Sequence, residues 1–377
     1  MPLKRHIFAA LLAVLLLLSA SALAEIDLKP YEIESARFST VEILAPDVYW
    51  VLHDGFMNGG RLPTALVLLD HRQKVFELRL PEDPDDDPHT SYTLFVADKN
   101  HYGLRTFDSN TYSTRFQLWK NGVLSEGFAL EGLPDFEPLP DWLCRLHQQD
   151  GMCSVERFDW DGILLSSTPV SEIEPTPYSG FTVLSDKSIA YIAWDINVSQ
   201  DQYRLYHLRV SRNGEPLSAV PVSLPNESFP PIGAFSPNGG ILSYTDAKLT
   251  GRREPYFSFL ACSDMDGNLR FAKSLKAKGI SLSVTQAVLR DDGSSTVYGA
   301  AIRSSRSIFR AFKLELNASG HILSRNVRDF TTRADYQYTV KLDPLGNAYV
   351  VTEDENRIAI VPFEDLPVLD DIEFVLE

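Results

Sequence analysis

The chain has 377 residues, of which 44% are hydrophobic, which is enough for a packed core and argues against global disorder. Because 51 Asp and Glu residues outnumber 35 Lys and Arg residues, the formal net charge is -16 at pH 7. That balance argues against nucleic acid as a partner and against adsorption to an anionic membrane. Three cysteines are too few for a disulfide-rich scaffold or a zinc module with four thiolate ligands.

The first 24 residues have the three parts of a cleavable signal peptide. Lys4 and Arg5 form a basic start, Ile7–Leu18 form a short apolar run, and Ala22-Leu23-Ala24 is a small-x-small cleavage site. We therefore expect cleavage after Ala24 and a mature chain of residues 25–377 that is secreted or periplasmic. No later run of the sequence approaches the length of a membrane span, so no membrane contact is expected after cleavage.

Export makes disulfides possible, and two cysteines lie close in the sequence. Cys144 and Cys153 flank Arg145–Met152, which is typical of two strands joined by a turn at Gly151. Either the two cysteines form a local disulfide, or they are two buried thiols that never meet. The third cysteine, Cys262, lies in an apolar run and is expected to pack as a small hydrophobic residue.

Most of the mature chain consists of short runs of β-branched and aromatic residues separated by Gly, Asn, Asp and Pro, which indicates an all-β fold. Within it a turn recurs in which a small polar residue precedes Gly and an aliphatic residue follows. The Gly-to-Gly steps are 40, 52, 53 and 53 residues. The dipeptides are Asn121-Gly122, Asp161-Gly162, Asn213-Gly214, Asp266-Gly267 and Ser319-Gly320.

A second turn recurs about thirty residues before the Gly turn of the same unit. Its members are Ser185–Ser188, Ser236–Gly239, Arg290–Gly293 and Asp343–Gly346. One unit is therefore strand, turn, strand, variable loop, strand, Gly turn and strand. A four-stranded antiparallel repeat of this length predicts a β-propeller blade.

The sequence can be divided into seven such blades, with six or eight as alternatives because the ends are irregular. The final run Ile372–Leu376 could close the ring against the N-terminal blade. The alternative of stacked β-sandwiches is disfavoured by the near-constant step. The expected blades are residues 41–80, 92–131, 139–172, 181–224, 232–276, 284–330 and 338–376.

This turn-and-strand repeat resembles the broad β-propeller superfamily that includes quinoprotein-like and WD-like repeats. The resemblance covers nearly all of the mature chain, but its motifs are generic: serial Trp-Asp endings, paired kelch glycines and the Trp-docking repeat of quinoprotein dehydrogenases are all missing. It implies a fold and no activity.

The order of the turns separates two faces of such a propeller. The short turns join the first strand to the second and the third to the fourth. The longer second-to-third loops lie on the opposite face, together with the connections between blades, and variable loops on a rigid frame commonly carry function. A charged residue, acidic in all blades but one, ends the second strand of successive recognisable blades. These residues are Asp54, Asp108, Asp195, Asp246, Arg303, Glu353 and Asp354.

If the register holds, this set rings one mouth of the central channel. A ring of carboxylates suits Ca2+, a cationic ligand or a polyol. The alternative is that Asp at a loop start bonds its own backbone. The sequence therefore predicts an exported module that binds a protein or carbohydrate ligand on the long-loop face. A carbohydrate-active hydrolase or lyase with two paired carboxylates is the alternative, and a scaffold that only displays a surface is the third. Whether the chain is an enzyme stays open.

Overall fold

The computed structural model describes most of the chain after residue 23. The described residues are 24–27, 39–46, 48–53, 56–57, 60–61, 65–70, 73–79, 90–97, 101–120, 123–131, 136–139, 142–149, 152–169, 180–197, 202–225, 228–229, 231–248, 255–303, 308–330, 337–354 and 357–377. The predicted signal peptide lies outside them except for Ala24. In the described part, no helix is long and apolar enough to cross a membrane.

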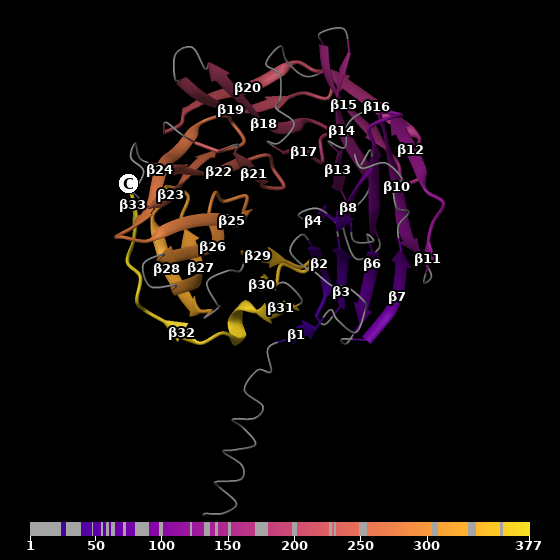
Figure 1. Ribbon diagram of the computed structural model, residues 1–377. Coiled ribbons are helices and arrows are strands. Elements are labelled where there is room, and N and C mark those ends of the chain that lie inside the picture. The colour runs from indigo at the N-terminus through magenta and orange to yellow at the C-terminus, as the bar shows by residue number, and fades with distance from the viewer. Residues whose placement is uncertain are drawn as a thin grey trace, which may run out of the picture.

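The strands form seven antiparallel blades around a central axis, which confirms the predicted all-β propeller and its blade number (Figure 1). Blades 1 to 3 occupy the first half of the chain. Blade 1 contains β2 (Ser39–Ala45), β3 (Val48–His53), β6 (Ala65–Asp70) and β7 (Gln73–Arg79), with the small hairpin β4 (Phe56–Met57) and β5 (Gly60–Arg61) between β3 and β6. Blade 2 contains β8 (Thr90–Val96), β9 (Tyr102–Asp108), β10 (Ser113–Lys120), β11 (Val123–Leu124) and β12 (Phe128–Glu131). Blade 3 contains β13 (Phe136–Leu139), β14 (Trp142–Gln149), β15 (Met152–Phe158) and β16 (Leu164–Pro169).

Blades 4 to 7 follow, and two of them gain a fifth strand from the end of the chain. Blade 4 contains β17 (Phe181–Val183), β18 (Ile189–Asn197), β19 (Gln202–Val210) and β20 (Pro216–Ser223). Blade 5 contains β21 (Ile232–Phe235), β22 (Ile241–Lys248), β23 (Tyr256–Ser263), β24 (Leu269–Ala277) and β33 (Phe374–Leu376). Blade 6 contains β25 (Ser281–Leu289), β26 (Ser295–Arg303), β27 (Ile308–Leu316), β28 (Ile322–Asp329) and β32 (Val368–Leu369). Blade 7 contains β29 (Gln337–Leu342), β30 (Ala348–Asp354), β31 (Arg357–Pro362) and β1 (Ala24–Asp27), and the 3-10 turn η4 (Phe363–Asp365) follows it.

The ring is closed by the N-terminal strand, so the predicted closure by Ile372–Leu376 is wrong. Strand β1 pairs with β31 along Ala24–Asp27 and fills the outer position of blade 7. The C-terminal strand β33 instead pairs with β24 of blade 5. Its Phe374 is buried against Phe312 of blade 6, with ring centroids 5.1 Å apart, so an apolar contact draws the C-terminus away from blade 1 (Figure 1).

Apolar side chains fill the junctions between neighbouring blades. Among the described residues a separate cluster of buried hydrophobic side chains occupies each of the seven junctions. The propeller is therefore stabilised by blade-on-blade burial, at about 25 cal/mol per Å² of apolar surface removed from water.

The recurrent Gly turns owe their shape to their first residue as well as to their glycine. In blade 3, Asp159 Oδ1 accepts hydrogen bonds from the backbone N–H groups of Asp161, at 3.0 Å, and Ile163, at 2.8 Å. Ser211, Asp264 and Asn317 make the same pair of bonds in blades 4 to 6. Gly162 then takes a φ of 83°, which a side chain would disfavour.

Candidate functional site

The predicted acid ring falls on residues whose backbone the structure places at one end of the second strands. Asp108 and Arg303 are the last residues of β9 and β26, and Asp195 and Asp246 lie two residues before the ends of β18 and β22. In blade 7, β30 ends with Glu353 and Asp354. Asp54 lies outside the described residues. The side chains described within this set are those of Asp108 and Asp246.

Asp108 holds its own loop. Its Oδ1 accepts from the backbone N–H of Asn110 at 2.9 Å, and its Oδ2 accepts from the hydroxyl of Thr111 at 3.0 Å. This is the loop-start chemistry that the alternative interpretation of the ring anticipated.

Asp246 joins two blades. Its Oδ1 accepts from Ser258 Oγ of the same blade at 3.0 Å, and its Oδ2 accepts from Ser283 Oγ of blade 6 at 2.7 Å. Burial raises the pKa of the carboxyl group, and the two serine hydroxyls oppose that shift. Among the described residues, no three His, Cys, Asp or Glu side chains converge as a metal site would require. The ring as a ligand site stays a prediction.

The register of blade 3 decides between the two alternatives for Cys144 and Cys153, a local disulfide or two thiols that do not meet. Strand β14 places Cys144 opposite Arg157, whereas Cys153 of β15 lies opposite Gln148. The two cysteines are thus offset by four residues along the ladder, about 13 Å at ~3.4 Å per residue. A disulfide needs Cα atoms within about 7 Å, so this pair does not form one.

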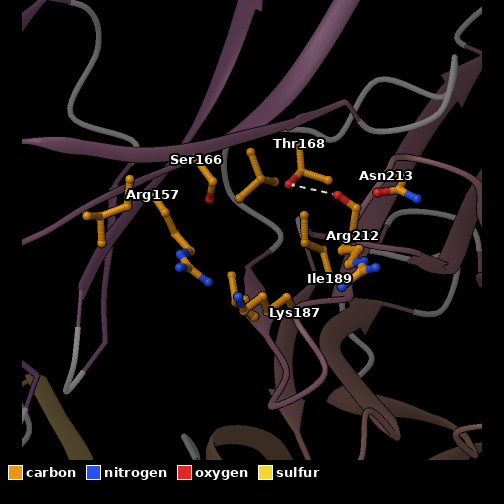
Figure 2. Close-up of a pocket in the computed structure, with 10 residues that line it drawn as sticks. Arg157, Ser166, Thr168, Lys187, Ile189, Arg212 and Asn213 are labelled. Atoms are coloured by element: carbon orange, nitrogen blue, oxygen red, sulfur yellow. Dashed lines mark hydrogen bonds between the residues drawn. The ribbon is translucent and has the colours of Figure 1, made fainter.

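The structure reveals a pocket that the sequence did not single out, between blades 3 and 4. Its volume is about 210 Å³. Strands β15 and β16 form one side, and β17, β18 and two short turns of blade 4 form the other (Figure 2). It therefore opens among the short turns, on the face opposite to the predicted ring. Its described lining residues are Val155, Arg157, Leu165, Ser166, Thr168, Val183, Lys187, Ile189, Arg212 and Asn213.

Arg157 is the cation that blade 3 contributes to the pocket. Its guanidinium carbon lies 4.1 Å from the ring centroid of Trp142 on the neighbouring strand β14. Such a contact contributes about 0.5–2 kcal/mol and keeps the planar fork in a defined orientation. The Nε atom is buried without a hydrogen-bond acceptor in the described part of the chain, so the stacking on Trp142 is the contact that orients this end of the side chain.

Lys187 reaches the pocket from a strained turn between β17 and β18. Leu184 N–H donates to Ser188 O, and Lys187 N–H donates to Leu184 O. These bonds place Lys187 at a φ of 67°, in the left-handed region that costs a non-Gly residue about 1–2 kcal/mol. Its side chain is exposed at the pocket, facing Arg157 across the opening (Figure 2).

The same turn in blades 5, 6 and 7 carries glycine at the position of Lys187. Gly239, Gly293 and Gly346 make the same backbone bonds and have φ values of 91°, 82° and 83°. The turn pattern in the sequence aligns Ser188 with these glycines. The hydrogen bonds show that the correct alignment is shifted by one residue, so a lysine replaces the glycine in blade 4.

Arg212 comes from the Gly turn between β19 and β20. Gly214 of that turn packs against Pro169 of blade 3, where an added Cβ would lie 2.5 Å from both Cγ and the carbonyl oxygen of the proline. Thr168 Oγ1 donates to the carbonyl oxygen of Arg212 at 3.4 Å, drawn as a dashed line in Figure 2. These contacts fix the turn against blade 3 and bring the exposed Arg212 side chain to the pocket.

The three cations have no ion-pair partner among the residues that the structure describes. The acid next to Lys187 is Asp186, which does not line the pocket. Its Oδ1 accepts from the Ser188 hydroxyl at 2.5 Å and the Ser188 backbone N–H at 2.9 Å. Those two bonds, followed by the charge of Arg209, hold the pKa of Asp186 below its usual range. The pocket is thus a local excess of positive charge on an acidic chain.

Comparison with known proteins assigns no family. No family model matches the chain, and no curated protein matches it. Among solved structures, the chain is similar to the β-propeller domain of the Trilobed protease from Pyrococcus furiosus, described as having an open velcro topology. The identity is 9%, the TM-score is 0.47, and the match covers 88% of this chain and 98% of that one.

Two further structures with similar strand arrangements are enzymes. The chain is 13% identical to puromycin hydrolase in a complex of its S511A mutant, with a TM-score of 0.42 and coverage of 87% and 60%. It is 12% identical to an endo-arabinase from Bacteroides thetaiotaomicron, with a TM-score of 0.30 and coverage of 74% and 94%. With TM-scores below 0.5 and identities of 9–13%, these matches assign neither a family nor an activity.

Proposed function

We propose that the protein is a ligand-binding propeller that holds an anionic ligand in the pocket between blades 3 and 4. The observation that carries the proposal is the convergence of Arg157, Lys187 and Arg212 on one pocket without an acidic partner in the described chain. An anion that reaches all three cations gains charge-assisted hydrogen bonds, and the two arginines can each offer a planar fork.

The repeat gives further support, because Lys187 and Arg212 differ from the equivalent residues of several other blades, whereas Arg157 has a counterpart in Arg209 of blade 4. The Gly turn has four residues and ends at the glycine. Its second residue is Trp160 in blade 3, Arg212 in blade 4, Met265 in blade 5 and Ala318 in blade 6. The other short turn carries lysine in blade 4 and glycine in the three following blades. Neither cation is therefore required to form its turn, which favours a role in binding.

The test is a thermal melt with added anions. Sodium phosphate and sodium succinate should raise the melting temperature above that in sodium chloride of equal ionic strength. The double variant Arg157→Gln, Arg212→Gln should lose that increase. Lys278→Gln removes an exposed cation outside the pocket and should keep it. Equal shifts in all three proteins, or no shift in any, would rule out this site.

The acid ring on the long-loop face is kept as a second candidate site. Its support is the backbone position of Asp108, the last residue of β9, and of Asp246, two residues before the end of β22. Both carboxylates also accept hydrogen bonds from nearby residues. A hydrolase would need two of its carboxylates in one pocket, about 5–10 Å apart. Adding Ca2+ and then EDTA should first raise and then lower the melting temperature; an unchanged melt would count against a metal-dependent ring.

Export belongs to the same proposal. The ladder between β1 and β31 includes Ala24, and cleavage after Ala24 would leave Glu25, Ile26 and Asp27 to complete blade 7. Mass spectrometry of the protein recovered outside the cytoplasm should give an N-terminus at Glu25. A recovered chain that still begins at Met1 would contradict it.

A further inference from the structure

Building on the proposed anion site, we infer that its ligand is a small organic acid with two carboxylate groups joined by a short carbon chain, held between blades 3 and 4. The inference rests on the distribution of the cations, the character of the walls, the size of the pocket and the strain at Lys187.

The cations come from two sides. Arg157 lies on the blade 3 side, and Lys187 and Arg212 lie on the blade 4 side (Figure 2). A ligand with one negative charge would neutralise one side and leave the opposite cation without a partner. Two separated negative charges match both sides, and each gains Coulomb energy without crowding the other.

The surface between the cations is mainly aliphatic. Of the lining residues, Leu165 is 48% exposed and Val183 is half-buried, so these two offer apolar surface to a ligand, while Val155 and Ile189 are already buried. A compact inorganic dianion such as phosphate would leave this wall against water, whereas a short carbon chain covers it and gains from the burial. Ser166 directs its hydroxyl toward the space and offers a donor to a carboxylate (Figure 2).

The size of the pocket limits the ligand. About 210 Å³ is below the usual 300–1,000 Å³ of sites for drug-sized molecules. It is also far more than the single probe sphere, ~10–15 Å³, that one water needs. A four- to six-carbon diacid fits between these bounds.

Lys187 is the residue that we infer to set the preference for two charges. Lys187 has a positive φ at a position that glycine occupies in the equivalent turns of blades 5, 6 and 7. Such backbone strain is found mainly where the side chain contributes to function. The lysine is exposed and has no partner among the described residues, so a second carboxylate is the group it is placed to meet.

The binding experiment uses isothermal titration of the mature protein with succinate, acetate and inorganic phosphate at one ionic strength. Succinate should bind at least about tenfold more tightly than either of the other two. Comparable affinities for all three would overturn the diacid inference and leave the anion site standing. Binding of none of them would overturn the anion site itself.

A variant then tests Lys187 alone. Lys187→Gly relieves the turn instead of disrupting it, so the protein is expected to fold, and far-UV circular dichroism checks this. It should lower succinate affinity about tenfold or more while changing acetate affinity by less than about threefold, since acetate needs one carboxylate contact. The control Lys278→Gln should change neither. A proportional loss for succinate and acetate in Lys187→Gly would contradict the assignment.

Discussion

Two neighbouring junctions share one backbone arrangement but differ in what fills them. The junction between blades 3 and 4 is open, and the junction between blades 4 and 5 is closed. In both, the third strand of the preceding blade ends in a register shift, after Arg157 at the junction of blades 3 and 4 and after Arg209 at that of blades 4 and 5. Arg209 is 9% exposed, and its terminal nitrogens donate to the Met265 carbonyl and to Ser188 Oγ. Within the part of the chain that the structure describes, Arg157 makes neither kind of bond, and it borders an open pocket.

The residues opposite each arginine explain the difference. At the junction of blades 4 and 5, Gly239 lies so close that an added Cβ would be 3.1 Å from Arg209 Nε. At the junction of blades 3 and 4 the same turn position is Lys187, whose charge would repel a guanidinium placed there. The closed junction therefore buries its arginine as a link between blades, and the open one keeps its cations accessible.

A second pair of equivalent residues points the same way. Two residues before each arginine stand Val155 at the open junction and His207 at the closed one. His207 is 1% exposed, with Nδ1 2.9 Å from Ser263 Oγ and Nε2 2.8 Å from Ser243 Oγ, both in blade 5. The open junction replaces this polar link with an aliphatic pocket wall. Both junctions contain an apolar cluster, but the closed one adds side-chain hydrogen bonds from His207 and Arg209 to blade 5.

The largest expected effect separates the two arginines. Arg209→Gln should lower the free energy of unfolding by about 3 kcal/mol, because it removes two hydrogen bonds from a charged donor, one to the Met265 carbonyl of blade 5 and one to Ser188 Oγ of its own blade, and leaves their acceptors unmet. Arg157→Gln should cost less, about 0.5–2 kcal/mol, which is the value of its stacking contact. Urea denaturation of the two variants measures both. Equal losses would mean that the junctions are not built differently.

The acid sensitivity of the closed junction comes next. Burial lowers the pKa of His207 from 6.5 to about 3. Below pH 6.5 the unfolded chain binds a proton at this histidine and the folded chain does not, so stability falls as the pH falls toward 3. Between pH 7 and pH 4.5 this one group should cost about 2–3 kcal/mol.

That prediction is checked by urea denaturation at both pH values with His207→Gln as the comparison. The carboxylates contribute to acid sensitivity in both proteins, so the informative quantity is the difference between their pH slopes. The variant should show the shallower slope. Identical slopes in the two proteins would show that His207 is not held neutral.

The smallest effect concerns the turn of the open junction. Lys187→Gly should raise the free energy of unfolding by about 1 kcal/mol, because glycine adopts a φ of 67° without the penalty of a side chain. The reverse change, Gly239→Lys, should destabilise the closed junction, since its Cβ would meet Leu184 at 2.5 Å. Melting temperatures of both variants provide the measurement, and a destabilised Lys187→Gly would contradict the assigned strain.

Much of the fold was accessible from the sequence because its signals are local. A Gly turn needs positive φ, and a strand of alternating character needs a sheet, so the repeat of turns gave the propeller and the seven blades. The blade that the final strand joins could not be predicted from the sequence. Phe374 could pack against any apolar edge, and the choice of blade 5 over blade 1 depends on which edge β1 already occupies.

The candidate site was less accessible. In the sequence, Lys187 is one lysine in an ordinary turn. The turn pattern aligns the next residue, Ser188, with the glycines of the other blades. Aligning Leu184–Ser188 with Ser236–Gly240 would have exposed a lysine in a glycine position. No sequence motif marks Arg157 as a pocket residue, because the residues that it meets across the junction depend on how blades 3 and 4 pack.

The sequence alone therefore determined an acidic all-β chain of seven repeated units with short turns on one face, because turn chemistry and strand periodicity act over a few residues. The tertiary structure decided which strand closes the ring, that Cys144 and Cys153 do not meet, and that three cations from two blades share one pocket. These outcomes depend on register and on blade-to-blade packing, which bring together residues tens of positions apart. The net charge argues against a polyanionic partner, and the packing brings three cations to one pocket, where we propose that a small anion binds.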